Sequence, residues 1–249
     1  MYTVENDEEK VNIDGNFYSK DKTILLDHEY EKSIKNVNII DGVIEIDEYA
    51  FAGSKSLETV KCPDSLETIR SAAFFNCENL KTVELPEDLI TIEDAVFQGC
   101  KNLETIELPD SLETIDAFAF NNCVALKNIK LPDSLLDLGQ SAFEGCTSLT
   151  SLKIPKYVGC IEKSLVAKCP NLEVLYIPST ITKFSKGCFL GSSFKEIRVY
   201  GGELSKGAKI SLASALKLDR HLEKESSDTY IRTTADGVDV KIIQNDVEP

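Results

Sequence analysis

Apolar residues recur along this chain at a constant interval of 23 positions. Four residue types keep this interval together: Leu57, Leu80, Leu103, Leu126, Leu149 and Leu172, then Pro63, Pro86, Pro109, Pro132, Pro155 and Pro178, then Phe51, Phe74, Phe97, Phe120 and Phe143, and then Cys77, Cys100, Cys123, Cys146 and Cys169. A strict period of about 20–50 residues is typical of repeat arrays. The pattern therefore predicts a stack of similar coils.

One repeat reads Leu-x-x-Ile-x-Leu-Pro-x-x-Leu-x-x-Ile-x-x-x-Ala-Phe-x-x-Cys. In the central copy, apolar and polar positions alternate over Ile106–Leu108, which predicts a short strand with one buried side. Pro109 lacks an N–H group, so it ends that strand and turns the chain. Leu112–Ile115 predicts a second extended segment. One coil cannot bury its own apolar residues, so its neighbours, stacked at about 4.8 Å, must cover them.

Two copies carry a resemblance to a known family: LKTVELPEDLITIEDAVFQGC (residues 80–100) and LKNIKLPDSLLDLGQSAFEGC (residues 126–146). Over about residues 13–200, the chain resembles the BspA-type, or Treponema pallidum-type, leucine-rich repeats. The resemblance implies a right-handed leucine-rich-repeat solenoid, mainly β with short helices, of about seven coils. It also implies a non-catalytic adhesion or interaction protein, because members of this family act as adhesins of mucosal bacteria and some protists.

The departures from the repeat suggest three parts: residues 1–33 as a tail and β-hairpin cap, 34–200 as the solenoid, and 201–249 as a helical cap and tail. Two apolar runs around Ser19–Lys22 predict the hairpin, which would cover the open apolar end of the first coil. Ser205 is a suitable N-cap for a helix extending to about Glu225. Residues 229–244 alternate in polarity and predict either a second hairpin or a second helix.

The eight cysteines are expected to be packing thiols rather than disulfides, because five of them share one repeat position. Ser54 and Ser192 take this position in the first and last copies, where we expect weaker burial. No Cys-x-x-Cys pair supports a zinc site, and we expect no cofactor. His28 lies in a polar stretch without a sequence partner, so we expect a solvated side chain.

A net charge of −15 argues against nucleic acid and against a bare anionic membrane as partners. No apolar run is long enough to insert into a bilayer. The first ten residues contain no signal peptide, which predicts a cytoplasmic protein if the chain is complete. The family resemblance instead favours a cell-surface or secreted protein. The oligomeric state is left open.

We expect no enzyme activity, because a smooth repeat surface does not converge carboxylates in a cleft and no nucleophile or phosphate motif is present. The informative surface is the outward side of the Leu-x-x-Ile-x-Leu segments, which we name the strand face. Two residues of each coil point outward there: Thr82 and Glu84, Thr105 and Glu107, Asn128 and Lys130, Ser151 and Lys153, Val174 and Tyr176, and finally Arg198. We expect these residues to bind a protein or glycan, with acidic or glycan partners toward the basic C-terminal half.

Alternatives to this reading remain. Threonine on an exposed strand has good β-propensity, so the first column could be purely structural. The array could serve as an intracellular scaffold or regulatory module, or as the targeting arm of a larger enzyme.

Overall fold

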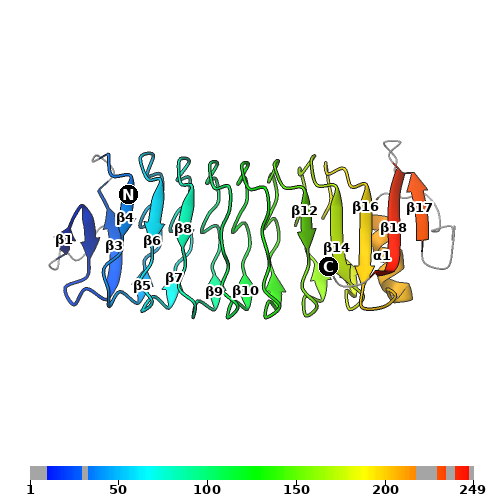
Figure 1. Cartoon of the computed structure of the whole chain (residues 1–249), viewed down its shortest axis with the longest axis horizontal. Coiled ribbons are helices and arrows are strands. Elements are labelled where there is room, and N and C mark those ends of the chain that lie inside the picture. Colours follow the sequence, from blue (N-terminus) through cyan, green and yellow to red (C-terminus); the bar gives the residue numbers. More distant parts are fainter. Residues whose placement is uncertain (1–9, 30–32, 217–228, 234–238, 247–249) are drawn as a thin grey trace.

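The proline of each repeat divides a coil into two extended segments, and successive coils stack these segments into two walls. The computed structural model describes residues 10–29, 33–216, 229–233 and 239–246. Within these ranges the coils form an elongated β-solenoid, with strands capping one end and a helix and a hairpin at the other (Figure 1). The mainly-β repeat fold predicted from the periodicity is therefore confirmed.

The first wall contains the strands that precede the proline corner: β4 (Asn36–Asn38), β6 (Thr59–Lys61), β8 (Thr82–Glu84), β12 (Ser151–Lys153), β14 (Val174–Pro178) and β16 (Glu196–Tyr200). Strands β4, β6 and β8 form one parallel sheet, and β12, β14 and β16 belong to a second one. Between them, Ile106–Leu108 and its equivalent in the next coil form no strand. The strand predicted at Ile106–Leu108 is wrong, because this segment makes no backbone ladder with its neighbours.

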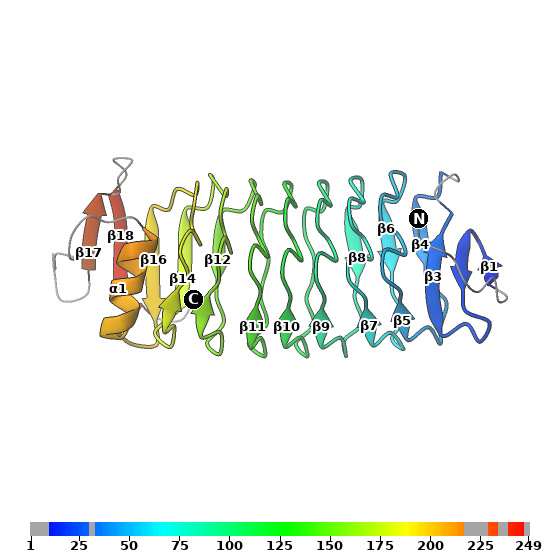
Figure 2. The same ribbon diagram turned by 180° about the vertical axis from the view of Figure 1, so that it is seen from behind.

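The second wall contains the strands that follow the corner: β5 (Glu45–Ile46), β7 (Thr68–Ile69), β9 (Thr91–Ile92), β10 (Thr114–Ile115), β11 (Asp137–Leu138), β13 (Cys160–Ile161) and β15 (Lys183–Phe184). Strands β5, β7, β9, β10 and β11 form one continuous parallel ladder (Figure 2). Strand β13 pairs separately with β15. The predicted second extended segment is confirmed. It holds the middle coils together where the first wall does not.

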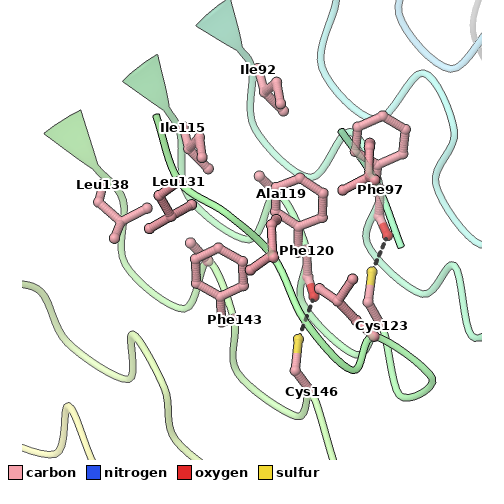
Figure 3. Packing of buried hydrophobic residues seen from close by; sticks show 14 of the residues in the cluster. Ile92, Phe97, Ile115, Ala119, Phe120, Cys123, Leu131, Leu138, Phe143 and Cys146 are labelled. Carbon is pink, nitrogen blue, oxygen red and sulfur yellow. Dashed lines mark hydrogen bonds between the residues drawn. The ribbon is translucent and has the colours of Figure 1, made fainter. Parts of the chain in front are cut away.

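The phenylalanine of each coil stacks on the phenylalanine of the next inside the solenoid (Figure 3). The ring centroids from Phe51 to Phe74, Phe97, Phe120 and Phe143 lie 5.0, 5.4, 5.4 and 5.5 Å apart. All five rings are fully buried. The column ends after Phe143, where Val166 takes the position in the following coil.

The cysteine column runs beside these rings, and its thiols donate hydrogen bonds to the backbone carbonyls of the phenylalanines. Each thiol donates to the phenylalanine carbonyl of the preceding coil, as Cys123 Sγ does to the Phe97 oxygen and Cys146 Sγ to that of Phe120, both at 3.2 Å (Figure 3). The five thiols of this column are fully buried, in agreement with the expected packing role. Ser54, expected to be less buried, is only 3% exposed because the cap covers the first coil.

The turn from phenylalanine to cysteine contains a position with left-handed backbone, which is occupied alternately by glycine and asparagine. The residue two positions after the phenylalanine has a positive φ in each of these coils. Glycine alternates there with asparagine: Gly53, Asn76, Gly99, Asn122 and Gly145. A Cβ atom added at Gly99 would lie 2.1 Å from Asn76 Oδ1, and one at Gly145 would lie 2.4 Å from Asn122 Oδ1. Each asparagine side chain therefore fills the space that the next glycine leaves open.

Three strands cap the N-terminal end: β1 (Val11–Ile13), β2 (Asn16–Tyr18) and β3 (Ile24–His28). The hairpin predicted around Ser19–Lys22 joins β2 to β3 and is confirmed, and β1 adds a second hairpin. Strand β3 continues into the second wall by pairing in parallel with β5. The cap is thus an extension of the coil stack rather than a separate cover.

His28 belongs to the buried core, so the expectation of a solvated side chain is wrong. Its side chain lies against Phe51, with ring centroids 5.2 Å apart, and its Nδ1 is 2.8 Å from Asn16 Oδ1. His28 stands 23 positions before Phe51 and occupies the phenylalanine column one coil earlier. The repeat period itself placed this ring inside the solenoid.

At the C-terminal end, α1 (Lys206–Ala215) packs against β15 and buries Ala208 and Leu212. The predicted N-cap is confirmed, because Ser205 Oγ accepts a hydrogen bond from the Ala208 N–H at 3.1 Å. The predicted continuation of the helix to about Glu225 lies outside the described residues. No helix in the described ranges is both long and apolar enough to cross a membrane.

The last segment is a hairpin, which decides between the two alternatives for residues 229–244. Strand β17 (Thr229–Thr233) pairs antiparallel with β18 (Asp239–Asp246), and β18 pairs in parallel with β16. The hairpin therefore extends the first wall beyond the last repeat, while α1 lies on the other side of the stack (Figure 2).

Candidate binding face

The strand face consists of two hydrogen-bonded parts. In the N-terminal part Thr59 is paired with Thr82 and Lys61 with Glu84, and in the C-terminal part Ser151 is paired with Val174. The predicted columns of outward residues are thus in register within each part. No bonded register joins Thr105, Glu107, Asn128 and Lys130, which come from the two unpaired middle coils.

The gap between the parts begins after β8. In the described chain, no backbone hydrogen bond connects Thr82–Leu85 with Thr105–Leu108. In the preceding pair of coils, the Cys62 N–H donates to the Glu84 carbonyl at 3.0 Å, and the equivalent bond from Leu85 to Glu107 is not made. The Leu85 N–H and the Glu107 carbonyl therefore lack the inter-coil partner that the equivalent groups have in the preceding pair of coils.

A ladder of ion pairs along one margin of the strand face is interrupted at the same place. The residue after the repeat leucine alternates in sign from coil to coil, through Lys35, Glu58, Lys81, Glu104 and Lys127. Nζ–O distances are 2.8 Å for Lys35–Glu58, 2.6 Å for Lys81–Glu58 and 2.7 Å for Lys127–Glu104. Among the described ion pairs, none joins Lys81 to Glu104.

These pairs shift the acidity of their carboxylates. Hydrogen bonds from Lys35 and Lys81 lower the pKa of Glu58 to about 2. The hydrogen bond from Lys127 lowers the pKa of Glu104. Both carboxylates stay charged at every physiological pH, so the margin of the strand face carries fixed charge.

A groove opens where the ladder is missing. It has a volume of about 450 Å³ and lies between the β8 coil and the coil that follows it. Leu85 and Leu108, which precede the proline in their coils, are partly exposed in it. Its margin carries four carboxylates: Glu84, Glu87, Glu107 and Asp110.

The C-terminal part carries two cations beside a tyrosine, and we name the outward residues Lys153, Val174, Tyr176 and Arg198 the aromatic platform. Lys153, Tyr176 and Arg198 form one row across β12, β14 and β16. The Arg198 guanidinium lies 5.8 Å from the centre of the Tyr176 ring. The predicted neighbourhood of Tyr176, Lys153 and Arg198 is therefore present in the structure.

Side chains below and beside the aromatic platform hold it in place. Lys153 Nζ lies 5.3 Å from the centre of the buried Tyr200 ring, and the Tyr200 hydroxyl donates to the Ile154 carbonyl at 2.6 Å. Glu196 accepts from Arg198 Nη2 at 2.7 Å. Because these contacts restrict rotamers before any ligand arrives, little side-chain entropy would be lost on binding.

Among the described residues, no group of three or more His, Cys, Asp or Glu side chains is arranged to hold a metal ion. Burial raises the pKa of Cys62 and of Cys77 to about 12, so these thiols stay protonated. The strand face presents hydrogen-bonding, charged and aromatic groups.

Sequence reasoning missed the groove, including Leu85, Leu108, Glu87 and Asp110. A signal was present at the position before the proline. The closed C-terminal sheet has β-branched residues at this repeat position, Ile154, Ile177 and Val199 (the last followed by Tyr200), whereas the coils on either side of the gap and the next coil have leucine, at positions 85, 108 and 131. β-Branched residues favour strands more than leucine does.

Comparisons with known proteins agree with this architecture. A family model described as the BspA type leucine rich repeat region matches residues 28–123 and 91–205 and finds six copies. Among solved structures, a leucine-rich repeat protein from T. pallidum has a TM-score of 0.61 and 26% identity, covering 83% of this chain and 96% of that one. No curated protein gave a significant match.

Two more distant structures share the fold. A leucine-rich repeat protein from Eubacterium ventriosum has a TM-score of 0.52 and 24% identity, covering 71% of this chain and 48% of that one. The pneumococcal vaccine antigen PcpA has a TM-score of 0.50 and 21% identity, covering 88% of this chain and 48% of that one.

Proposed function

The chain belongs to the BspA-type leucine-rich repeat family, and on this premise we propose that it is a non-catalytic adhesion module that binds a host protein or glycan through its strand face. Repeat proteins of this kind are generally interaction modules, because stacked coils give an extended surface rather than an enclosed reaction site. The role in adhesion at a bacterial surface rests on the family resemblance.

The aromatic platform is the observation that carries this proposal. Tyr176 and the stem of Arg198 offer apolar contact area, and the two cations beside it supply charge for carboxylates or sulfates. The outward residues of this sheet are half-buried by their neighbours, whereas those of the middle coils are exposed. A rigid, half-buried aromatic flanked by cations suits an acidic protein segment or an acidic glycan.

The free cysteines favour a second candidate, an intracellular interaction module using the same strand face. All eight thiols are unpaired, and proteins that keep many free thiols are more common in reducing compartments. Seven of the eight are buried in the solenoid, so oxidants reach them slowly. The two candidates differ in the compartment of the partner and not in the binding residues.

The proposal can be tested with three immobilised proteins: the wild type, Lys153→Ala/Tyr176→Ala, and the matched control Lys156→Ala/Tyr157→Ala. The control removes the same residue types from a turn outside the strand face, where Lys156 Nζ lies 4.7 Å from the centre of the exposed Tyr157 ring. Each protein would be exposed to a mucin-glycan array, to mucosal extract and to lysate of the producing cell.

We expect the wild type and the control to retain the same glycan or mucosal protein and the platform variant to lose about tenfold in affinity. Retention only from the producing cell's lysate would favour the intracellular module. Equal retention by all three proteins would contradict the assignment of binding to the aromatic platform.

A further inference from the structure

The groove after β8 is distinct in position and charge from the aromatic platform. It lies on the same strand face, so an assignment of its ligand rests on the proposed function of that face. The groove lies between two coils that share no backbone hydrogen bonds on this wall, in the part of the chain that the structure describes. Its volume of about 450 Å³ falls within the range of ligand pockets, about 300–1,000 Å³.

The floor of the groove is apolar. Val83 and Ile106 are buried beneath it, and Leu85 and Leu108 are partly exposed. In the closed coils, the residues at the position of Leu85 and Leu108 are covered, as Ile154 and Ile177 are fully buried. Beside the groove, Leu85 and Leu108 thus expose aliphatic surface that is buried at this repeat position in other coils, including at Leu131.

The margin of the groove is acidic and only partly neutralised. Lys61 Nζ lies 3.1 Å from the Glu84 carboxylate, and both of these side chains are largely exposed. Glu87, Glu107 and Asp110 make no ion pair with any described residue. The Lys61 contact is a solvated surface pair, which an incoming cation can replace at little cost.

We propose that the groove binds an arginine or lysine side chain presented by a basic, extended segment of a protein partner. The aliphatic stem of such a side chain would cover Leu85 and Leu108, and its charged head would reach Glu84 and Glu107. Long basic side chains favour this combination, because the stem seeks apolar surface while the head keeps a polar environment. The unpaired backbone groups of Leu85 and Glu107 would accept hydrogen bonds from, or donate them to, the main chain of the segment.

Other ligand classes fit the groove less well. No described cluster of acidic residues has the arrangement needed for a metal ion. The groove residues include no aromatic side chain on which a sugar ring could stack. The acidic margin would repel phosphorylated or sulfated ligands, so a cationic peptide is the complementary partner.

The test compares Glu84→Gln/Glu107→Gln with Glu67→Gln/Glu113→Gln. Both double variants raise the net charge from −15 by the same amount, and all four residues are exposed. The second pair lies outside the groove and therefore controls for general attraction of cations to an acidic protein. Binding of a blocked Ser-Arg repeat peptide would be measured by calorimetry, with Ser-Gln and Ser-Glu peptides of the same length as references.

We expect the wild type, the Glu67→Gln/Glu113→Gln control and the platform variant Lys153→Ala/Tyr176→Ala to bind the Ser-Arg peptide equally. The groove variant should bind about fivefold more weakly or worse, with an unchanged thermal midpoint. Equal weakening in the groove variant and its control, or no binding of Ser-Arg peptide to the wild type, would overturn the proposal. The proposal would also be overturned if the wild type formed a dimer and the groove variant alone stayed monomeric, because a second copy of the chain would then be the occupant.

The platform variant makes it possible to distinguish failure of the groove proposal from failure of the adhesion proposal. If it loses the mucosal ligand while the groove variant retains it and the Ser-Arg peptide fails to bind, the adhesion proposal survives and the groove proposal fails. If the groove variant alone loses both ligands, the groove is the main binding site of the strand face.

Discussion

At the scale of single residues, the buried phenylalanines and cysteines contact residues of the neighbouring coils at fixed repeat positions. Phe120 lies between Phe97 and Phe143, and Cys123 donates to the Phe97 carbonyl. A residue therefore has to be judged by the residues 23 positions away as well as by its local sequence. His28 is the case in which the two judgements disagree.

His28 should make the N-terminal cap sensitive to acid. Burial lowers its pKa below the ordinary value for histidine, although the charges of Asp27 and Glu29 act in the opposite direction. The unfolded chain therefore binds more protons than the folded chain between the lowered pKa and about 6.5. The stabilisation is fully present above about 6.5 and is lost as the pH falls toward the folded pKa.

Replacing His28 with phenylalanine removes the titrating group and continues the phenylalanine column. We expect the thermal midpoint of the wild type to fall between about pH 7 and about pH 5, and that of His28→Phe to change less. Hydrogen exchange of β1 to β3 would locate the effect in the cap. Identical pH profiles for the two proteins would show that another group governs acid stability.

At the scale of elements, the turn after the phenylalanine shows how two neighbouring coils depend on each other. Positive φ angles at glycine and asparagine let this turn reverse direction tightly. Because each asparagine side chain occupies the place of the next residue's Cβ, the turn has a period of two coils rather than one.

Gly145→Ala should therefore cost more than Gly53→Ala. Both positions have a φ of 77°, so both substitutions carry the left-handed penalty of about 1–2 kcal/mol. A Cβ at Gly145 additionally meets Asn122 Oδ1 at 2.4 Å, whereas one at Gly53 meets nothing within 4 Å. We expect an extra loss of about 1 kcal/mol at Gly145, measured by denaturant unfolding.

A second substitution isolates the cause of that difference. In the Gly145→Ala background, Asn122→Gly removes the obstructing side chain and keeps a residue that accepts positive φ. The extra loss should then disappear. If it persists, the cost of Gly145→Ala comes from the backbone alone.

Much of this element-level structure followed from the sequence, because the period fixes which residues are neighbours. It predicted the cysteine column, the proline corners and the second-wall strands. It did not predict the loss of pairing at Ile106–Leu108, since those residues match the motif as well as the closed coils do.

The candidate site followed the same division. The alternation of outward residues predicted the aromatic platform, because the register of a parallel ladder is set by the repeat. The groove was not predicted, because it arises from hydrogen bonds that are absent, and the leucine at positions 85 and 108 is only a weak signal of that absence. The C-terminal hairpin was predicted in part. The alternation of residues 229–244 was visible in the sequence, but the pairing of β18 with β16 was not.

At the scale of the whole molecule, both ends of the coil stack are extended by added strands, and a helix also packs on the C-terminal end. Strand β18 covers the free edge of β16, and α1 covers β15. An uncovered edge presents unpaired N–H and C=O groups that can pair with another chain. The end structures should therefore control solubility as well as stability.

Removing residues 201–249 exposes the edge of β16 and the apolar surface under α1. We expect the shortened chain to form concentration-dependent oligomers that the full chain does not form under the same conditions, because free edges pair with one another. Sedimentation velocity over a concentration series measures this. A shortened chain that sediments like the full chain at every concentration would mean that β16 needs no cover.

The open ladder beside β8 also has a mechanical consequence. Pulling the middle coils apart on the second wall would break the backbone bonds of β9, β10 and β11, whereas the same displacement beside Leu85 and Leu108 breaks none. We therefore expect the rod to bend most easily in the direction that widens the groove on the first wall and leaves the ladder of the second wall intact. A ligand that joined the two sides of the groove would stiffen this bending, so tension along the rod and occupancy of the groove would be coupled.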